Sequence, residues 1–144
     1  MGTRSQTKVI QRFTAYDTKE IIEKVICSMY RQYDGYLECH GQELAVFLSD
    51  TPLVNGISMN EKGNCFNGSG CLAAQMVAFF KDGAGGIYLE GIDNEGQGHD
   101  YQIICDEDKH EILIKVTIYD EVVFDGTRDE YNAFLTKEMA KEEE

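Results

Sequence analysis

The second half of the chain alternates apolar and polar residues, a period of two that is typical of half-buried β-strands. In residues 111–119 the apolar positions form one face, made of Ile112, Ile114, Val116 and Ile118. A similar composition predicts three more strands in this half, over 87–92, 101–105 and 122–125. The connections 106–110 and 120–121 are short and polar, and such connections join antiparallel neighbours.

The first third of the chain predicts a β-hairpin. Residues 8–13 and 21–33 are rich in Val, Ile and aromatic side chains, and residues 16–19 between them supply a polar turn. Arg4, Lys8 and Arg12 occupy even-numbered positions, so in an extended strand their side chains project from one face.

Between the two strand regions the apolar period changes to 3.6 residues, which predicts helices. A short helix contains Leu44, Phe47 and Leu48 and ends before Pro52, and residues 53–67 follow as a polar loop. The next helix begins with Ser69 as N-cap. It ends at Asp82-Gly83, and the residues that match helical spacing in it are Leu72, Gln75, Met76, Phe79 and Phe80.

A last helix starts at Thr127, where Glu130 completes a capping box, and we expect residues 140–144 to fray. The order of elements is therefore β-β-α-α-β-β-β-β-α within a single domain, 1–144. This order predicts an α+β fold, in which an antiparallel sheet of about six strands carries about three helices on one face.

Charge narrows the range of partners. The chain has 13 Lys and Arg against 26 Asp and Glu, a net charge of −13. Duplex nucleic acid requires a basic surface, so we expect no such partner. Residues 1–31 nevertheless hold six basic and three acidic side chains, +3, which leaves −16 for the remainder. A small anion can therefore still bind locally, although the acid excess is also explained by solubility alone.

Other sequence patterns exclude further classes of protein. The sequence holds no apolar run long enough to span a membrane, and its first residues lack the apolar core of a signal peptide, so we expect a cytoplasmic protein without a membrane partner. Five cysteines, none at Cys-x-x-Cys spacing, favour a reduced protein without a disulfide framework or a zinc site. The acidic segments 93–100 and 106–110 are interpreted as solvated turns, and no metal or cofactor is predicted.

The densest polar and aromatic segment spans residues 29–36 and is followed by His40-Gly41. Arginine offers a planar fork for phosphate or carboxylate, and tyrosine offers a stacking face with a hydroxyl group. The candidate ligand-binding residues here are Arg31, Tyr33, Asp34, Tyr36 and His40. The alternative interpretation is a strand with ordinary alternating packing, closed by a turn at Asp34-Gly35.

A second candidate lies at the start of the predicted helix, where Ser69 and Gly70 could present backbone N–H groups to an anion. Helices also begin in this way for capping alone, and the segment lacks the spacing of known phosphate-binding loops. Cys71 in the same turn could be a nucleophile, provided that His40, His99 or His110 lies beside it.

Part of the sequence resembles a known family. Residues 1–5, Met-Gly-Thr-Arg-Ser, and residues 29–36, Met-Tyr-Arg-Gln-Tyr-Asp-Gly-Tyr, are followed by a segment from His40 to Leu48 that completes the pattern. The combination resembles a small family of uncharacterised proteins in phages, bacteria and some eukaryotes, closely over 1–5 and 29–48 and in outline elsewhere. Residues 37–39 depart from the family pattern. The resemblance implies no catalytic residue, but it singles out Arg4, Arg31, Tyr33, Asp34, Tyr36 and His40.

These observations lead to a ranked set of hypotheses. The first is a non-catalytic binding protein for a small anionic, nucleotide-derived ligand, which in a phage would sequester a host signalling nucleotide in the host cytoplasm. The second is an acidic interaction module or inhibitor of a host protein. The third is a small hydrolase acting on a nucleotide, or a thiol enzyme using Cys71. An exposed edge strand or apolar helix face could also build a homo-oligomer.

Overall fold

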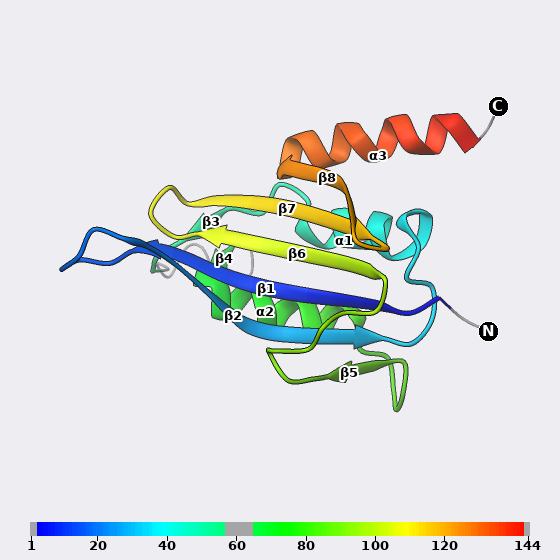
Figure 1. Cartoon of the computed structure of the whole chain (residues 1–144), viewed down its shortest axis with the longest axis horizontal. Helices are drawn as coiled ribbons and strands as arrows, with labels where there is room; N and C mark the ends of the chain where they lie inside the picture. Colours follow the sequence, from blue (N-terminus) through cyan, green and yellow to red (C-terminus); the bar gives the residue numbers. More distant parts are fainter. Residues whose placement is uncertain (1–2, 57–64, 143–144) are drawn as a thin grey trace.

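A six-stranded, mostly antiparallel sheet forms the centre of the molecule (Figure 1). The computed structural model describes residues 3–56 and 65–142. The strands of the sheet are β1 (Ser5–Thr14), β2 (Ile21–Arg31), β5 (Ile87–Leu89), β6 (His99–Asp106), β7 (Glu111–Ile118) and β8 (Glu121–Thr127). Their order across the sheet is β5-β2-β1-β6-β7-β8. The predicted α+β class, hairpin and C-terminal strands are therefore confirmed.

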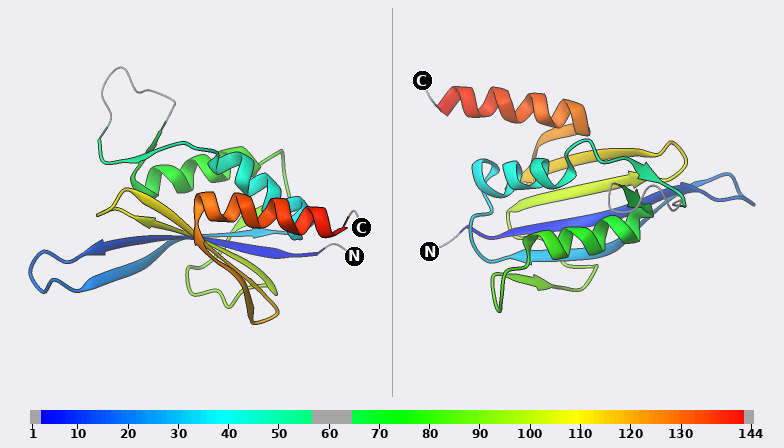
Figure 2. Two further views of the ribbon diagram at one scale, coloured as in Figure 1. Left: turned by 90° about the horizontal axis from the view of Figure 1, so that it is seen from above. Right: turned by 180° about the vertical axis from the view of Figure 1, so that it is seen from behind.

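The helices lie on one face of this sheet, as Figure 2 shows in the view from above. They are the π-helical turn η1 (Leu37–Gly41), α1 (Gln42–Leu48), α2 (Gly68–Phe80) and α3 (Arg128–Glu142). Two short strands, β3 (Leu53–Val54) and β4 (Phe66–Asn67), pair in parallel beside them. No helix within the described residues is long and apolar enough to cross a membrane.

The core lies between the helices and the inward-facing residues of the strands. Ile112, Ile114 and Val116 are buried, as their alternation predicts, because successive strand residues point to opposite faces. Burying each aliphatic side chain of this kind contributes about 1.5–3 kcal/mol. The helices complete the core with Leu44, Leu48, Leu72, Met76, Tyr131 and Leu135.

One pairing in the sheet differs from the prediction of a purely antiparallel sheet. β1 and β6 run parallel, from the pair Ser5–His99 to the pair Arg12–Asp106. The short strand β5 pairs with β2 at the edge of the sheet, so the position beside β1 is taken by the next strand, β6. Residues 90–98 then carry the chain back across the sheet. The alternation of apolar and polar residues predicts which segments form strands. It does not predict which strands, far apart in the sequence, pair with each other.

Several predicted boundaries also shift. α2 begins at Gly68 with Asn67 as its N-cap, so Ser69 lies inside the helix rather than capping it. The segment 53–67 includes the β3–β4 pair, and its residues 57–64 lie outside the described structure. The capping box at the start of α3 is confirmed, because Thr127 and Glu130 exchange hydrogen bonds of 2.9 and 3.2 Å. Residues 140–142 belong to α3, and residues 143–144 lie outside the described structure, so the fraying expected for 140–144 stays a prediction.

Candidate functional site

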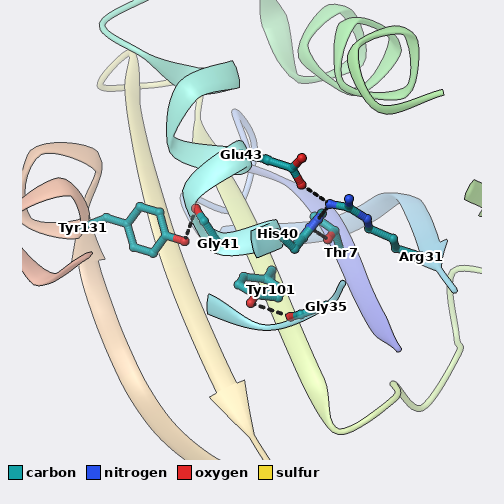
Figure 3. Close-up of polar contacts among 8 residues, drawn as sticks. All are labelled: Thr7, Arg31, Gly35, His40, Gly41, Glu43, Tyr101 and Tyr131. Atoms are coloured by element: carbon teal, nitrogen blue, oxygen red, sulfur yellow. Dashed lines mark hydrogen bonds and ion pairs between the residues drawn. The ribbon is translucent and has the colours of Figure 1, made fainter. Parts of the chain in front are cut away.

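The chain reverses sharply after β2 and brings His40 back beside Arg31 (Figure 3). Asp34 has a positive φ of 64°, which starts the turn. Gly35 follows, and a Cβ there would lie 2.8 Å from the carbonyl oxygen of Arg4, so only glycine lets the loop pack this closely against the chain leading into β1. The loop and the turn η1 therefore place the side chain of His40 in the core, where it is fully buried.

Four polar side chains form a continuous chain of contacts at this point. The Nη1 atom of Arg31 lies 3.1 Å from Nδ1 of His40 and donates a hydrogen bond to the carboxylate of Glu43. Arginine can only donate, so Nδ1 of His40 must accept. The proton of the neutral ring is therefore on Nε2, which donates to the hydroxyl of Thr7 over 2.7 Å. Burial, with a smaller contribution from the charge of Arg31, lowers the pKa of His40 to about 3.

Two buried tyrosines contact the two ends of the loop that carries His40 (Figure 3). The hydroxyl of Tyr101 donates to the carbonyl oxygen of Gly35, and that of Tyr131 donates to the carbonyl oxygen of Gly41, both over 2.8 Å. Burial raises the pKa of both phenols, most strongly that of Tyr101, so they remain protonated donors. Strand β6 and helix α3 thus fix the two ends of the segment that carries His40.

A pocket of about 180 Å³ opens beside Arg31. Arg31, Tyr33 and Asp34 line it on one side, and on the other it is lined by Phe80, Asp82, Gly85, Gly86 and Ile87. The guanidinium carbon of Arg31 lies 5.6 Å from the ring centroid of Phe80. The N–H of Gln32 donates to the carbonyl oxygen of Gly86 over 2.8 Å, which joins the two sides.

The structure therefore brings together three of the residues expected from the sequence: Arg31, Tyr33 and Asp34. His40 lies behind Arg31 and not among the residues that line the pocket, because both its ring nitrogens are already hydrogen-bonded. Tyr36 makes an edge contact with His99 at 5.8 Å and is not among the lining residues either. Arg4 is exposed on the segment that contacts Gly35.

The second candidate region is separate. Ser69 and Phe80 stand at opposite ends of α2, roughly 16 Å apart along its axis at the usual rise per residue. The carboxylate of Glu107 accepts hydrogen bonds from both the N–H and the hydroxyl of Ser69, each over 3.0 Å. The start of α2 therefore binds an anion, as its unpaired N–H groups predict, but this anion is the carboxylate of the protein's own Glu107. Gly70 lies beside it in a shallow surface hollow.

Several residues that line the Arg31 pocket were not predicted from the sequence. Phe80 was identified only by its helical spacing, and Asp82 only as the end of the helix, where Gly85-Gly86 follows. Both glycines have positive φ values, 79° and 75°. Paired glycines after a helix were the available signal, since they expose backbone that a ligand can approach. Nothing local indicated that this loop would face Arg31.

The arrangement provides groups that can recognise a ligand. The buried, neutral His40 cannot exchange a proton with a pocket from which it is separated by Arg31. Cys71 contacts Gln75 at 3.2 Å, and no contact between Cys71 and a histidine is found among the described residues. In the same part of the chain, no three His, Cys, Asp or Glu side chains are grouped so as to hold a metal ion.

Comparisons with protein-family models, with curated protein sequences and with solved structures gave no match.

Proposed function

We propose that this protein binds a small, singly charged, nucleotide-derived anion in the Arg31 pocket and does not transform it. The observation that carries the proposal is the arrangement of Arg31 itself. Among the described residues, its side-chain hydrogen bonds all run through Nη1, to His40 and Glu43. Nε and Nη2 are left to donate to a ligand, in the paired geometry that suits phosphate or carboxylate.

Preorganisation supports this assignment. The side chain of Arg31 is only 16% exposed and is held by His40, Glu43 and the ring of Phe80. A ligand that binds to an arginine already held in place does not have to immobilise it, which removes a cost of about 0.5–1.5 kcal/mol per ordered side chain. His40 and Glu43 are therefore positioning residues for Arg31.

Aromatic and carboxylate groups of the pocket support the proposal that the ligand is derived from a nucleotide. Tyr33 is 54% exposed, so its ring is accessible for stacking by a base. Asp34 and Asp82 provide hydrogen-bond acceptors for ribose hydroxyls or base N–H groups. A Cβ at Gly86 would meet no atom within 4 Å, so the backbone there is open to a ligand.

Size and charge limit the ligand. At about 180 Å³ the pocket is smaller than the roughly 300–1,000 Å³ typical of sites that enclose a drug-sized molecule. It therefore holds one part of a nucleotide while the remainder lies across Tyr33. Arg31 is the one cation among the lining residues, against the carboxylates of Asp34 and Asp82. Repulsion from these carboxylates favours a phosphodiester over a triphosphate.

A phage origin, which the sequence resemblance implies, would give this proposal a biological setting. A compact acidic protein that binds a nucleotide without transforming it would act by sequestration. In an infected cell its target would be a nucleotide signal of the host.

Native mass spectrometry before and after incubation with a nucleotide-rich cell extract tests the proposal. We expect a discrete added mass of a few hundred daltons, which is lost in Arg31→Ala. Arg12→Ala is the matched control, because Arg12 forms an exposed salt bridge with Glu23 on the β1–β2 hairpin and is not among the lining residues of the pocket. Tyr33→Ala is a second variant that removes an exposed ring with little effect on folding.

The outcomes separate the hypotheses. Added mass that survives both Arg31→Ala and Tyr33→Ala would remove this pocket from the site. No added mass, with the extract unchanged in composition, would contradict nucleotide binding and direct the search to a protein partner. Conversion of an extract nucleotide by the wild-type protein would show that the protein is an enzyme.

A further inference from the structure

The face of the sheet opposite the helices carries a second pocket, of about 200 Å³. Thr7, Tyr101 and Ile103 point toward the helices, so the alternating residues of the same strands point away from them. Gln6 of β1, Asp100 of β6 and Thr117 of β7 lie side by side in the strand register and line this pocket. The β5–β6 connection, residues 90–98, passes over this face (Figure 2) and contributes Glu95 and Gly96 to the pocket wall.

The connection is held in place by its own hydrogen bonds. The ammonium group of Lys8 donates to the carbonyl oxygen of Asn94. The N–H of Gly96 donates to the side-chain oxygen of Asn94 over 2.8 Å, and the N–H of Gln97 donates to the carboxylate of Asp100 over 2.9 Å. The pocket therefore has a formed wall, and its one cation, Lys8, is engaged in supporting that wall.

Acceptor groups predominate in the pocket. Its lining includes the carboxylates of Glu95, Asp100 and Asp120 and the ammonium group of Lys8, which gives a formal charge of −3 + 1 = −2. Gln102 and Thr117 add neutral polar groups. A carboxylate cluster alone would be explained by the acidic surface of the protein, so a further observation is needed to indicate a ligand.

Gln6 provides that observation. The residue is 1% exposed, and its amide nitrogen donates to the hydroxyl of Ser28 over 2.6 Å. Its Oε1 atom is buried and has no hydrogen-bond partner within residues 3–56 and 65–142. A buried acceptor without a partner is costly, so proteins rarely leave one unpaired. Because Gln6 lines the pocket, a bound N–H donor can supply the missing hydrogen bond.

We infer that this pocket binds a small organic cation that carries N–H donors, such as an alkylammonium or a guanidinium group. The positive charge matches the net charge of the lining, and the N–H groups match the unpaired oxygen of Gln6. A bare metal ion fits less well, because no three His, Cys, Asp or Glu side chains of the described residues are grouped to coordinate one. The site is independent of the Arg31 pocket, which lies at the end of β2 and is lined by other residues.

The test is titration of the full chain with putrescine and with methylguanidinium, followed by the NMR shifts of the Gly96 and Gln97 amides. Tetramethylammonium is the control ligand, because it has the same type of charge but no N–H group. We expect putrescine or methylguanidinium to move these amides saturably and tetramethylammonium to leave them unchanged. The two active probes distinguish an alkylammonium site from a guanidinium site.

Two double variants separate the site from general attraction by an acidic protein. Glu95→Gln with Asp120→Asn removes two exposed carboxylates of the pocket without changing their shape. Asp17→Asn with Glu20→Gln makes the same change of charge in the exposed β1–β2 turn. We expect the first pair to weaken binding about tenfold or more, since charge-assisted hydrogen bonds are lost, and the second pair to change it little.

Three results would overturn the inference. They are equal weakening by both pairs of substitutions, equal binding of tetramethylammonium, and no saturable shift with either probe. The last result would mean that water satisfies Gln6. None of these results bears on nucleotide binding, so failure here and failure of the proposed function are distinguishable.

Discussion

The Nη1 atom of Arg31 lies 3.1 Å from the Nδ1 atom of His40, and this contact determines both the protonation and the role of the histidine. Because the guanidinium group has no acceptor, His40 must be neutral with its proton on Nε2. Protonation of Nδ1 would place two positive charges in contact inside the core. His40 therefore acts as a fixed acceptor that orients Arg31, and several properties of the protein depend on it.

The first prediction concerns pH. The pKa of His40 in the folded protein is about 3, below the 6.5 of the unfolded chain, mainly because of burial. The unfolded state therefore binds the proton more tightly, and the stability contributed by the neutral ring is present above pH 6.5 and lost as the pH falls towards 3. This one residue should lower the free energy of unfolding by about 1.4 kcal/mol per pH unit in that window.

Urea unfolding between about pH 7 and 5, above most carboxylate pKa values, measures this slope. We expect it to be smaller in His40→Gln, whose amide can still accept from Arg31 and donate to Thr7 without titrating. His110→Gln, in an exposed turn, should retain the wild-type slope. An unchanged slope in His40→Gln would contradict a neutral buried histidine.

The second prediction concerns the two tyrosines that donate hydrogen bonds to the loop. Tyr101→Phe and Tyr131→Phe each leave a buried carbonyl oxygen, of Gly35 or Gly41, without its donor. We expect each substitution to cost about 1–3 kcal/mol of unfolding free energy. Tyr16→Phe is the control, because Tyr16 is 91% exposed and its loss of a hydroxyl should be neutral. Neutral behaviour of Tyr101→Phe would mean that the hydroxyl does not hold the loop.

The third prediction compares alanine substitutions at two glycines, which we expect to change the free energy of unfolding in opposite directions. A Cβ at Gly35 would lie 2.8 Å from both Arg4 O and Ser5 Cβ, so Gly35→Ala must displace the loop and should cost about 1–3 kcal/mol. A Cβ at Gly70, within α2, meets nothing within 4 Å, and Gly70→Ala should stabilise the protein by about 0.4–1 kcal/mol. Thermal unfolding of both variants checks the signs, and destabilisation by Gly70→Ala would show that its surroundings are more crowded than described.

The fourth prediction concerns Glu107. Burial acts to raise the pKa of its carboxylate, but hydrogen bonds from Ser69 and Gln11 together lower it below the usual 4.5. The stability that these hydrogen bonds contribute is fully present above pH 4.5. It is lost as the pH falls below 4.5 and through the lowered pKa of Glu107. Glu107→Ala should cost about 1–2 kcal/mol at neutral pH, because the N–H and the hydroxyl of Ser69 at the start of α2 lose their acceptor. Glu20→Ala, at the exposed β1–β2 turn, should cost little. Equal stability of the two variants would show that Glu107 does not stabilise the helix start.

Sequence periodicity predicted most of the elements correctly. Alternation over 111–119 identified β7 and its buried face, and the Thr127–Glu130 pair located the start of α3 within one residue. These features depend on neighbours a few positions apart, which is the range in which local sequence acts. Arg31, Tyr33 and Asp34 are likewise close in the sequence and line one pocket, and their role in binding a ligand stays a prediction.

The tertiary structure alone decided how distant segments meet. The parallel pairing of β1 with β6, the position of Gly85-Gly86 opposite Arg31, and the carboxylate of Glu107 at Ser69 all join residues far apart in the chain. The role of His40 was decided in the same way, because its partners Thr7 and Arg31 lie on different strands and the core removes it from water. Local pattern specifies which face of an element is apolar, whereas the packing of all the elements together decides which polar groups are buried, paired or left open to a ligand.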